Sequence, residues 1–368
     1  MRGLNMAFHR SICASLLLCA AVLTAQPART IVAVSATGGD YLRGAGGTLA
    51  KFIDEGYKVY VIQVGNDEKN SIGLGPAETR LANNADGDRA AFRTAVLEGL
   101  SRPSRAIPAR FLYDEAGSAL FDAICEVPEY YLTRTEIDIL KLHAADIASR
   151  AGPGCALIEF GSGSSVKSRL LLDALKDPAL YAPVDISRDH LDQTAHRLRR
   201  DYPGLAIEPV CADYMMLEDL PAIAPGTPRL GFFPGSTIGN LEPHEARLFL
   251  RRARRLLDDK GAMVLGVDLR KDPRRLHAAY NDEAGVTASF TLNLLRRMNR
   301  ELGATFDPSQ FAHDASYNSA EGRIEIYFRS LRRQSVMVAG HSFAFAEGQR
   351  VHTEYSYKYD IAGLASLA

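Results

Sequence analysis

Short apolar runs rich in β-branched and aromatic residues alternate with longer amphipathic segments over most of this 368-residue chain. The segments between the runs carry apolar residues at helical spacing, which predicts helices. We place five strands at residues 156–160, 182–186, 207–211, 230–233 and 263–267. Strands separated by helices are typical of a parallel sheet that is covered on both faces. The pattern therefore predicts a doubly wound α/β fold.

The first 28 residues do not follow this pattern. Basic residues, Arg2 and Arg10 among them, precede a mostly apolar run from Ile12 to Ala25, and small residues follow it. This order is typical of a secretory signal sequence, and the run is too short to span a bilayer comfortably as a mature helix. The alternative interpretation is a start codon placed too far upstream.

The pattern of residues 29–85 predicts a separate β-α-β unit. Its strands are expected at residues 30–35 and 57–64, with a helix at 48–55 between them. The chain then becomes polar, and we place a domain boundary near Asp86. The main domain accordingly covers residues 86–368.

The β-α-β unit resembles the start of the PIG-L-type (LmbE-like) deacetylases. The resemblance rests on its first strand, the turn Gly44-Ala-Gly-Gly47 and the string Asn66-Asp-Glu-Lys69. Those enzymes open with a His-Pro-Asp-Asp-like metal motif, but Thr37 and Gly39 stand where the histidine ligand and the catalytic aspartate would be. A catalytic zinc ion needs about three protein ligands. We therefore expect an inactive fragment.

Composition and charge exclude several classes of function. The formal net charge of −1 does not favour nucleic acid or an anionic membrane as a partner. The most basic stretch, residues 247–257, carries leucines at helical spacing, so its arginines are interpreted as the wet face of a helix rather than a phosphate-binding patch. The five cysteines form no CxxC pair, and no histidine cluster has metal-ligand spacing. We predict no metal site.

A glycine-rich turn, Gly161-Ser162-Gly163, follows the first strand of the main domain and leads into a helix expected at residues 166–175. Glycines let a ligand approach the backbone closely, and a helix N-terminus favours a carboxylate. Lys167, in the first turn of that helix, is a candidate partner for such a carboxylate. The turn alone does not distinguish methyltransferases from dinucleotide enzymes.

Acidic residues after the next two strands narrow the choice of cofactor. Asp185 ends the second strand, where a carboxylate can bridge two ribose hydroxyls. Asp213 and Tyr214 close the third strand and can meet the amino group and ring face of adenine. The third glycine of the dinucleotide fingerprint, expected near Val166, is absent. These features are typical of an S-adenosylmethionine site in a class I methyltransferase fold.

Longer strings point to one family. They are Arg110–Ser118, Pro128–Glu136, Gly235–Asn240, Asp268–Asp272, Ala279–Gly285 and Thr353–Lys358. With these strings the chain resembles the ergothioneine-biosynthesis L-histidine Nα-methyltransferases from about residue 86 to residue 358. The resemblance implies a class I methyltransferase sheet with an inserted or appended substrate-binding subdomain.

The resemblance also implies roles for individual residues. The positions that would bind S-adenosylmethionine are Gly161, Ser162, Gly163, Lys167, Asp185, Asp213 and Tyr214. The positions that would bind the substrate are Tyr130, Asn240, Tyr280, Glu354, Tyr355 and Ser356. Within that set, Asn240 and Tyr280 would hold the substrate carboxylate. Glu354 and Ser356 would hold the imidazole, while Tyr113 and Asn240 would serve the reacting amine as catalytic residues.

The expected reaction is successive methylation of L-histidine to its Nα-trimethyl betaine, hercynine, the first step of ergothioneine biosynthesis. Transfer from a sulfonium is an in-line displacement, so catalysis consists mainly of placing a neutral amine. Tyrosine faces can stabilise the quaternary ammonium product. A buried Glu354 would select for an imidazole N–H, because any other substrate would leave its carboxylate unpaired.

Two alternatives stay open: methylation of another amino acid or an indole amine, and an inactive ligand-binding remnant. The second rests on the C-terminus, since the family continues beyond Lys358 with a helix and a strand whose loss would expose a sheet edge. We expect a monomer that acts on a small molecule, without a nucleic-acid or stable membrane partner. The cofactor predicts a cytoplasmic location, in conflict with the signal-like start.

Overall fold

The computed structural model describes residues 60–62, 85–163, 165–186, 188–258, 261–365 and 367. The signal-like segment and nearly all of the predicted β-α-β unit lie outside these residues. In the described part of the chain, no helix combines the length and the apolar character needed to cross a membrane.

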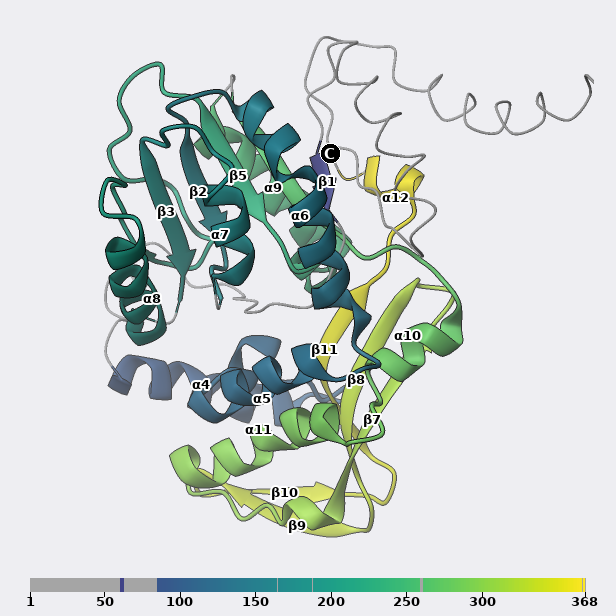
Figure 1. Ribbon diagram of the computed structural model, residues 1–368. Coiled ribbons are helices and arrows are strands. Elements are labelled where there is room, and N and C mark those ends of the chain that lie inside the picture. Colours follow the sequence, from purple (N-terminus) through teal and green to yellow (C-terminus); the bar gives the residue numbers. More distant parts are fainter. Residues whose placement is uncertain are drawn as a thin grey trace, which may run out of the picture.

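Parallel strands form the central sheet in the order β1-β6-β5-β2-β3-β4 (Figure 1). All strands predicted for the main domain are present, with ends shifted slightly: β2 (Ala156–Phe160), β3 (Leu180–Asp185), β4 (Val210–Cys211), β5 (Arg229–Phe233) and β6 (Ala262–Gly266). The remaining strand, β1 (Tyr60–Ile62), lies within the second strand predicted for the N-terminal unit. It pairs in parallel with Val264–Gly266, so the edge of β6 is covered by a segment from before the main domain.

Helices cover both faces of this sheet, as the alternation of strands and helices predicts. On one face α9 (Pro243–Leu257) packs its Phe249 on Phe160 of β2, with ring centroids 5.4 Å apart. On the other face Leu157 of β2 contacts a core shared by α6 (Tyr131–Ala151), α7 (Val166–Leu172) and α8 (Arg188–Asp201). The two cores separate because successive side chains of a strand point to opposite faces.

A second unit lies beside the carboxyl ends of the central strands (Figure 1). Its helices are α4 (Ala85–Ser101), α5 (Glu115–Glu126), α10 (Pro273–Ala279) and α11 (Val286–Leu302), with the short helical turns η1 (Ala109–Leu112) and η3 (Pro308–Gln310). Its antiparallel strands are β7 (Phe311–Asn318), β8 (Arg323–Ser330) and β11 (Arg350–Tyr357), with the hairpin β9 (Gln334–Val338) and β10 (His341–Phe345). One apolar core joins these elements. This unit is an antiparallel subdomain added to the central sheet, as the resemblance implies.

The end of β11 attaches the second unit to the central sheet. Gly239, in the turn η2 (Thr237–Asn240), lies so close to β11 that a Cβ atom there would be 2.7 Å from the Tyr357 carbonyl oxygen. Just beyond β11, the Tyr359 N–H donates to the Asp268 carbonyl at 2.9 Å. The chain then forms α12 (Ile361–Ala365). These contacts hold β11 directly against the carboxyl ends of β5 and β6.

Candidate active site

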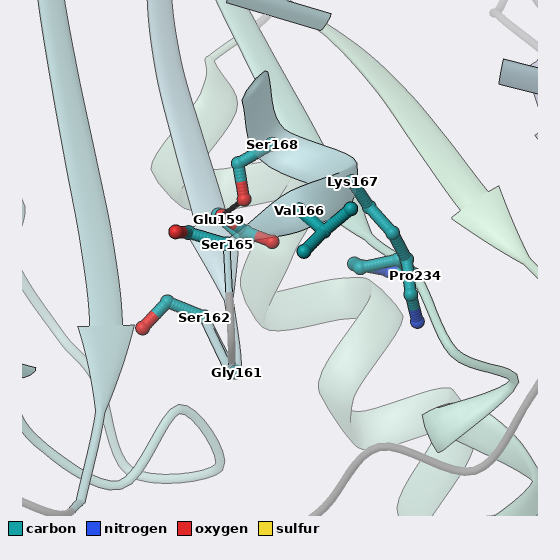
Figure 2. Close-up of a pocket in the computed structure, with 8 residues that line it drawn as sticks. All are labelled: Glu159, Gly161, Ser162, Ser165, Val166, Lys167, Ser168 and Pro234. Carbon is teal, nitrogen blue, oxygen red and sulfur yellow. Dashed lines mark hydrogen bonds between the residues drawn. The ribbon is translucent and has the colours of Figure 1, made fainter. Parts of the chain in front are cut away.

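The glycine-rich turn after β2 forms a small pocket (Figure 2). Gly161 and Gly163 have φ values of 78° and 40°, which glycine adopts without strain. The Ser162 hydroxyl is buried and has no hydrogen-bond partner among the described residues. A buried hydroxyl without a protein partner fits a polar ligand at this turn. The lining residues are Glu159, Gly161, Ser162, Ser165, Val166, Lys167, Ser168 and Pro234.

Glu159, at the end of β2, holds this turn in place. Its carboxylate accepts a hydrogen bond from Ser168 of α7 at 2.6 Å and another from the Tyr181 hydroxyl of β3. Burial raises the pKa of Tyr181 well above its ordinary value, and the adjacent Glu159 charge adds to this shift. The phenol therefore stays protonated and donates to the carboxylate.

Lys167 forms a buried ion pair beside the same pocket. Its Nζ lies 2.9 Å from Glu136 Oε2, and the Glu136 carboxylate also accepts the Gly235 N–H at 2.9 Å. One carboxylate thus links α6, α7 and the loop after β5. The sequence singled out Lys167 but gave Glu136 no role, although Glu136 ends one of the family strings.

The acids after β3 and β4 lie at the same edge of the sheet as the turn. The Gly161 N–H donates to the Val184 carbonyl, and the Ala212 N–H donates to the Asp185 carbonyl at 3.0 Å, so the three strand ends are adjacent. Asp185 is buried, whereas Asp213 is half-buried and accepts the Met215 N–H at 2.8 Å.

Tyr214 belongs to the core of the sheet as much as to this edge. Its ring centroid lies 5.3 Å from that of Phe233 and 5.5 Å from that of Phe249. The ring is therefore fixed by edge-on aromatic packing under the acidic edge.

Four predicted substrate-binding side chains form two buried hydrogen-bonded pairs. Asn240 Nδ2 donates to Glu354 Oε1 at 3.1 Å, and the hydroxyls of Tyr280 and Ser356 lie 2.9 Å apart. All four side chains are at most 4% exposed. Glu354 and Ser356 share one face of β11, because alternate residues of a strand point the same way.

Two more of the predicted tyrosines, Tyr113 and Tyr130, join this group through aromatic packing. The ring of Tyr130 meets that of Tyr280 edge-on at 6.1 Å and that of Phe121 at 6.3 Å. Tyr113 packs on Phe121 at 5.9 Å and on Phe290 at 5.1 Å. A continuous cluster of rings therefore runs from Tyr113 to Tyr280.

Tyr355 does not join these side chains. Its ring lies on the opposite face of β11, stacked on His352 with centroids 3.9 Å apart and covered by the Arg323 guanidinium at 3.8 Å. The alternation along the strand separates it from Glu354 and Ser356. The geometry therefore does not support Tyr355 as a substrate-binding side chain.

A charged network that the sequence analysis missed lies behind the substrate-binding pairs. Lys358 Nζ donates to the Tyr280 hydroxyl at 2.7 Å and to Ser356 Oγ at 2.8 Å. It also lies 3.2 Å from Asp268 Oδ2, and both side chains are fully buried. The signal available in the sequence was a lysine that follows two tyrosines within the string Thr353–Lys358.

Asp268 is the centre of this network. It accepts a hydrogen bond from the Tyr131 hydroxyl at 2.7 Å and pairs with Lys271 as well as Lys358. Burial alone would raise the pKa of Asp268, but the two lysines hold it below its ordinary value. Burial likewise opposes the charge of Lys358, yet Tyr280 and Asp268 hold the pKa of that lysine above its ordinary value. The Asp268–Lys358 pair is thus ionised.

Comparisons with known proteins identify the family of this chain. Residues 92–368 match a family described as histidine-specific methyltransferase, SAM-dependent. Histidine N-alpha-methyltransferases from Mycolicibacterium smegmatis and Mycobacterium tuberculosis are each 42% identical to this chain. The alignments cover 75% and 74% of this chain, respectively, and 86% of each relative. Ergothioneine biosynthesis protein 1 of Neurospora crassa is 33% identical over 69% of the chain, which spans 30% of that protein.

Proposed function

The chain belongs to the histidine-specific, SAM-dependent methyltransferase family, and from this we propose that it methylates the α-amine of L-histidine. The enzyme has a class I methyltransferase sheet with an added antiparallel subdomain. The names of its relatives supply the substrate and the pathway, ergothioneine biosynthesis. The observation that carries the proposal is the buried Glu354, held by Asn240 at the junction of the two units.

A buried carboxylate at this position supports recognition of an imidazole. A carboxylate only accepts hydrogen bonds, and a substrate imidazole N–H provides a donor of matching polarity. An aliphatic or indole side chain of another shape would provide a poorer match or none. Histidine is therefore favoured over other amino acids and indole amines, the second candidate class of substrate.

The turn after β2 fits S-adenosylmethionine. Gly161 and Gly163 have positive φ values, the Ser162 hydroxyl has no hydrogen-bond partner among the described residues, and Asp185 ends the next strand. We propose that Gly161, Ser162, Gly163, Lys167, Asp185, Asp213 and Tyr214 hold the cofactor. When bound, the cofactor supplies a methyl group on a positively charged sulfonium.

The residues of this chain would contribute placement and proton handling. Asn240 and Tyr280 would hold the carboxylate, which orients the α-amine, and Tyr113 would accept or relay the proton that the amine must lose. The rings of Tyr113, Tyr130 and Tyr280 would surround the amine with aromatic faces. Such faces stabilise a cation that has no N–H left, so we propose that methylation proceeds to the trimethyl product, hercynine.

The N-terminal region adds two proposals. Residues 29–85 are proposed to be an appended unit without deacetylase activity, because Thr37 and Gly39 replace the metal-binding residues. The enzyme is proposed to act as a cytoplasmic monomer, and the mass of the intact expressed protein will show whether the signal-like segment is removed.

The direct experiment incubates the protein with L-histidine and S-adenosylmethionine and follows the products by mass spectrometry. We expect histidine to gain one, two and finally three methyl groups. Methylated tryptophan or another amine in its place would favour the second candidate, and binding without any product would indicate an inactive remnant.

Substitution of Glu354 tests the recognition of the imidazole. We expect Glu354→Gln to raise the KM for histidine at least about tenfold, because a charged hydrogen bond is worth about 1.5–3 kcal/mol. The matched control is Glu325→Gln, a carboxylate on the opposite face of the same sheet that binds Arg323. Unchanged selectivity of Glu354→Gln for histidine over tryptophan would contradict the assignment.

A further inference from the structure

Lys358 uses all of its hydrogen-bonding capacity inside the protein. An ammonium group has three donors, and the described neighbours of Lys358 provide three acceptors: Tyr280, Ser356 and Asp268. The side chain is fully buried. Lys358 therefore acts on a substrate through these neighbours and not by direct contact.

The contacts of Lys358 determine the direction of the hydrogen bonds at Tyr280 and Ser356. Both hydroxyl oxygens accept from the ammonium, and the two oxygens lie 2.9 Å apart. The pair has two hydroxyl hydrogens, and their mutual bond uses only one. The other hydrogen has no acceptor among the described residues.

A buried hydroxyl hydrogen without an acceptor is costly, so it points to a ligand atom that can accept it. Glu354 lies on the same face of β11 as Ser356 and has the opposite polarity, since a carboxylate only accepts. The site thus combines an acceptor with a donor. This combination matches histidine. Its neutral imidazole has one N–H that donates and one lone-pair nitrogen that accepts, and its carboxylate also accepts.

We propose that Lys358 is a positioning residue that fixes the Tyr280–Ser356 pair as a donor to an acceptor atom of the bound amino acid. The inference rests on the proposed function, because it takes histidine as the ligand. Asp268 anchors Lys358 from behind and is itself held through its backbone N–H, which donates to Ser236 Oγ at 2.9 Å. The acceptor atom is either the lone-pair nitrogen of the imidazole or a carboxylate oxygen.

The matched control is a second buried lysine on the same carboxylate. Lys271 also pairs with Asp268, but its other contacts are the Tyr131 hydroxyl at 2.9 Å and the Leu269 carbonyl at 2.7 Å. Lys271 therefore resembles Lys358 in burial and charge, without contacting Tyr280 or Ser356.

The experiment measures the Kd of L-histidine for the protein loaded with S-adenosylhomocysteine, by calorimetry. We expect Lys358→Met to weaken histidine binding by about tenfold or more while the Kd of S-adenosylhomocysteine stays unchanged. Lys271→Met should leave the histidine Kd within about twofold. Equal weakening in the two variants, or none in Lys358→Met, would overturn the proposal.

The two single variants also separate positioning from stability. Each leaves Asp268 with one of its two lysines, so we expect Lys358→Met and Lys271→Met to lose similar amounts of thermal stability. Only Lys358→Met should lose histidine affinity. A loss of affinity that follows the loss of stability in both variants would show that Lys358 has only a structural role.

Changes in the ligand identify the acceptor atom. Titration of L-histidine at pH 8 and pH 5.5, below the imidazole pKa of about 6.5, tests the imidazole nitrogen, and histidinamide tests the carboxylate. A loss of affinity in either arm that is larger in wild type than in Lys358→Met supports the donor pair, and equal losses in the two proteins, or full affinity in both arms, overturn it. If wild-type protein does not methylate histidine, the proposed function fails. If wild-type protein methylates histidine and Lys358→Met binds it as tightly as wild type, only the role of Lys358 is rejected.

Discussion

Two residues before Glu354, the ring of His352 lies between those of Tyr355 and Tyr327, with centroids 3.9 Å and 5.2 Å away. Burial lowers the pKa of this imidazole to about 4, although a backbone hydrogen bond near Glu354 opposes the shift. Its Nε2 atom has no partner among the described residues. His352 is thus a neutral aromatic residue of the sheet. Its backbone also joins β11 to the segment before η1, because the His352 N–H donates to the Arg105 carbonyl and the Ile107 N–H donates to the His352 carbonyl.

This imidazole should make the protein sensitive to acid. The unfolded chain binds a proton at His352 below about pH 6.5, but the folded chain does so only below about 4. Stability is therefore lost as the pH falls through this interval, by up to about 3 kcal/mol for this group. His352→Phe keeps the ring stack and removes the titration, so urea unfolding at pH 7 and pH 4.5 should show a smaller loss than in wild type. Identical losses in the two proteins would contradict this explanation.

Single residues were predicted unequally well from the sequence. Asn240, Tyr280, Glu354 and Ser356 fall in long strings, and the structure brings them together. Asp268 and Lys358 occur in such strings too, but their pairing joins positions far apart in the chain, which spacing alone cannot reveal. Tyr355 was grouped with its neighbours in sequence, whereas the alternation of a strand places it on the other face.

At the scale of elements, the contact between η2 and β11 fixes the geometry of the site. Gly239 lies against the backbone of Tyr357, and Asn240 follows it and reaches Glu354. Any atom added at Gly239 must push the turn away from the strand. The turn and the strand therefore form one structural unit, although they belong to different parts of the chain.

Gly239→Ala should separate these two elements. Its Cβ would lie 2.7 Å from the Tyr357 oxygen and 3.3 Å from its nitrogen, both backbone atoms that cannot rotate away. We expect a loss of about 2 kcal/mol in the free energy of unfolding and a larger rise in KM for histidine than for S-adenosylmethionine. Gly204→Ala is the control, since nothing lies within 4 Å of its Cβ position. Chemical denaturation and initial rates provide both measurements, and a neutral Gly239→Ala variant would refute the close contact.

The central strands were predictable because each is a short apolar run between amphipathic helices. The ends of the strands were less predictable. Of the predicted run 207–211, β4 includes Val210–Cys211, and Ile207 forms an isolated bridge to Tyr181. Helix α7 ends at Leu172 and not at Leu175. Ends of elements depend on tertiary contacts that a local pattern does not contain.

At the scale of the whole molecule, residues 60–62 extend the central sheet of the enzyme. The sequence analysis treated residues 29–85 as a separate unit. The structure instead places β1 along β6. No local pattern in either segment indicates this pairing, because it joins Val61 to Leu265.

Removal of residues 1–84 should therefore weaken the fold without removing the site. We expect the free energy of unfolding to fall by about 2 kcal/mol, since a few backbone hydrogen bonds of about 1 kcal/mol each are lost. Binding of S-adenosylhomocysteine should persist, because all proposed site residues lie between Tyr113 and Ser356. Removal of residues 1–28 alone is the control and should leave stability unchanged. Equal stability of both shortened proteins would show that β1 contributes nothing.

The pairing of β1 has a consequence for how copies of the enzyme meet. The two outermost strands of the central sheet are β1, which the structure describes over Tyr60–Ile62, and β4 (Val210–Cys211). A long unpaired strand is a template on which another chain can form β-structure, and short edge strands remove that template. Without β1, the five-residue β6 would present its free N–H and C=O groups to other molecules. Because β1 pairs with Val264–Gly266, we expect it to limit edge-to-edge association between copies of the enzyme.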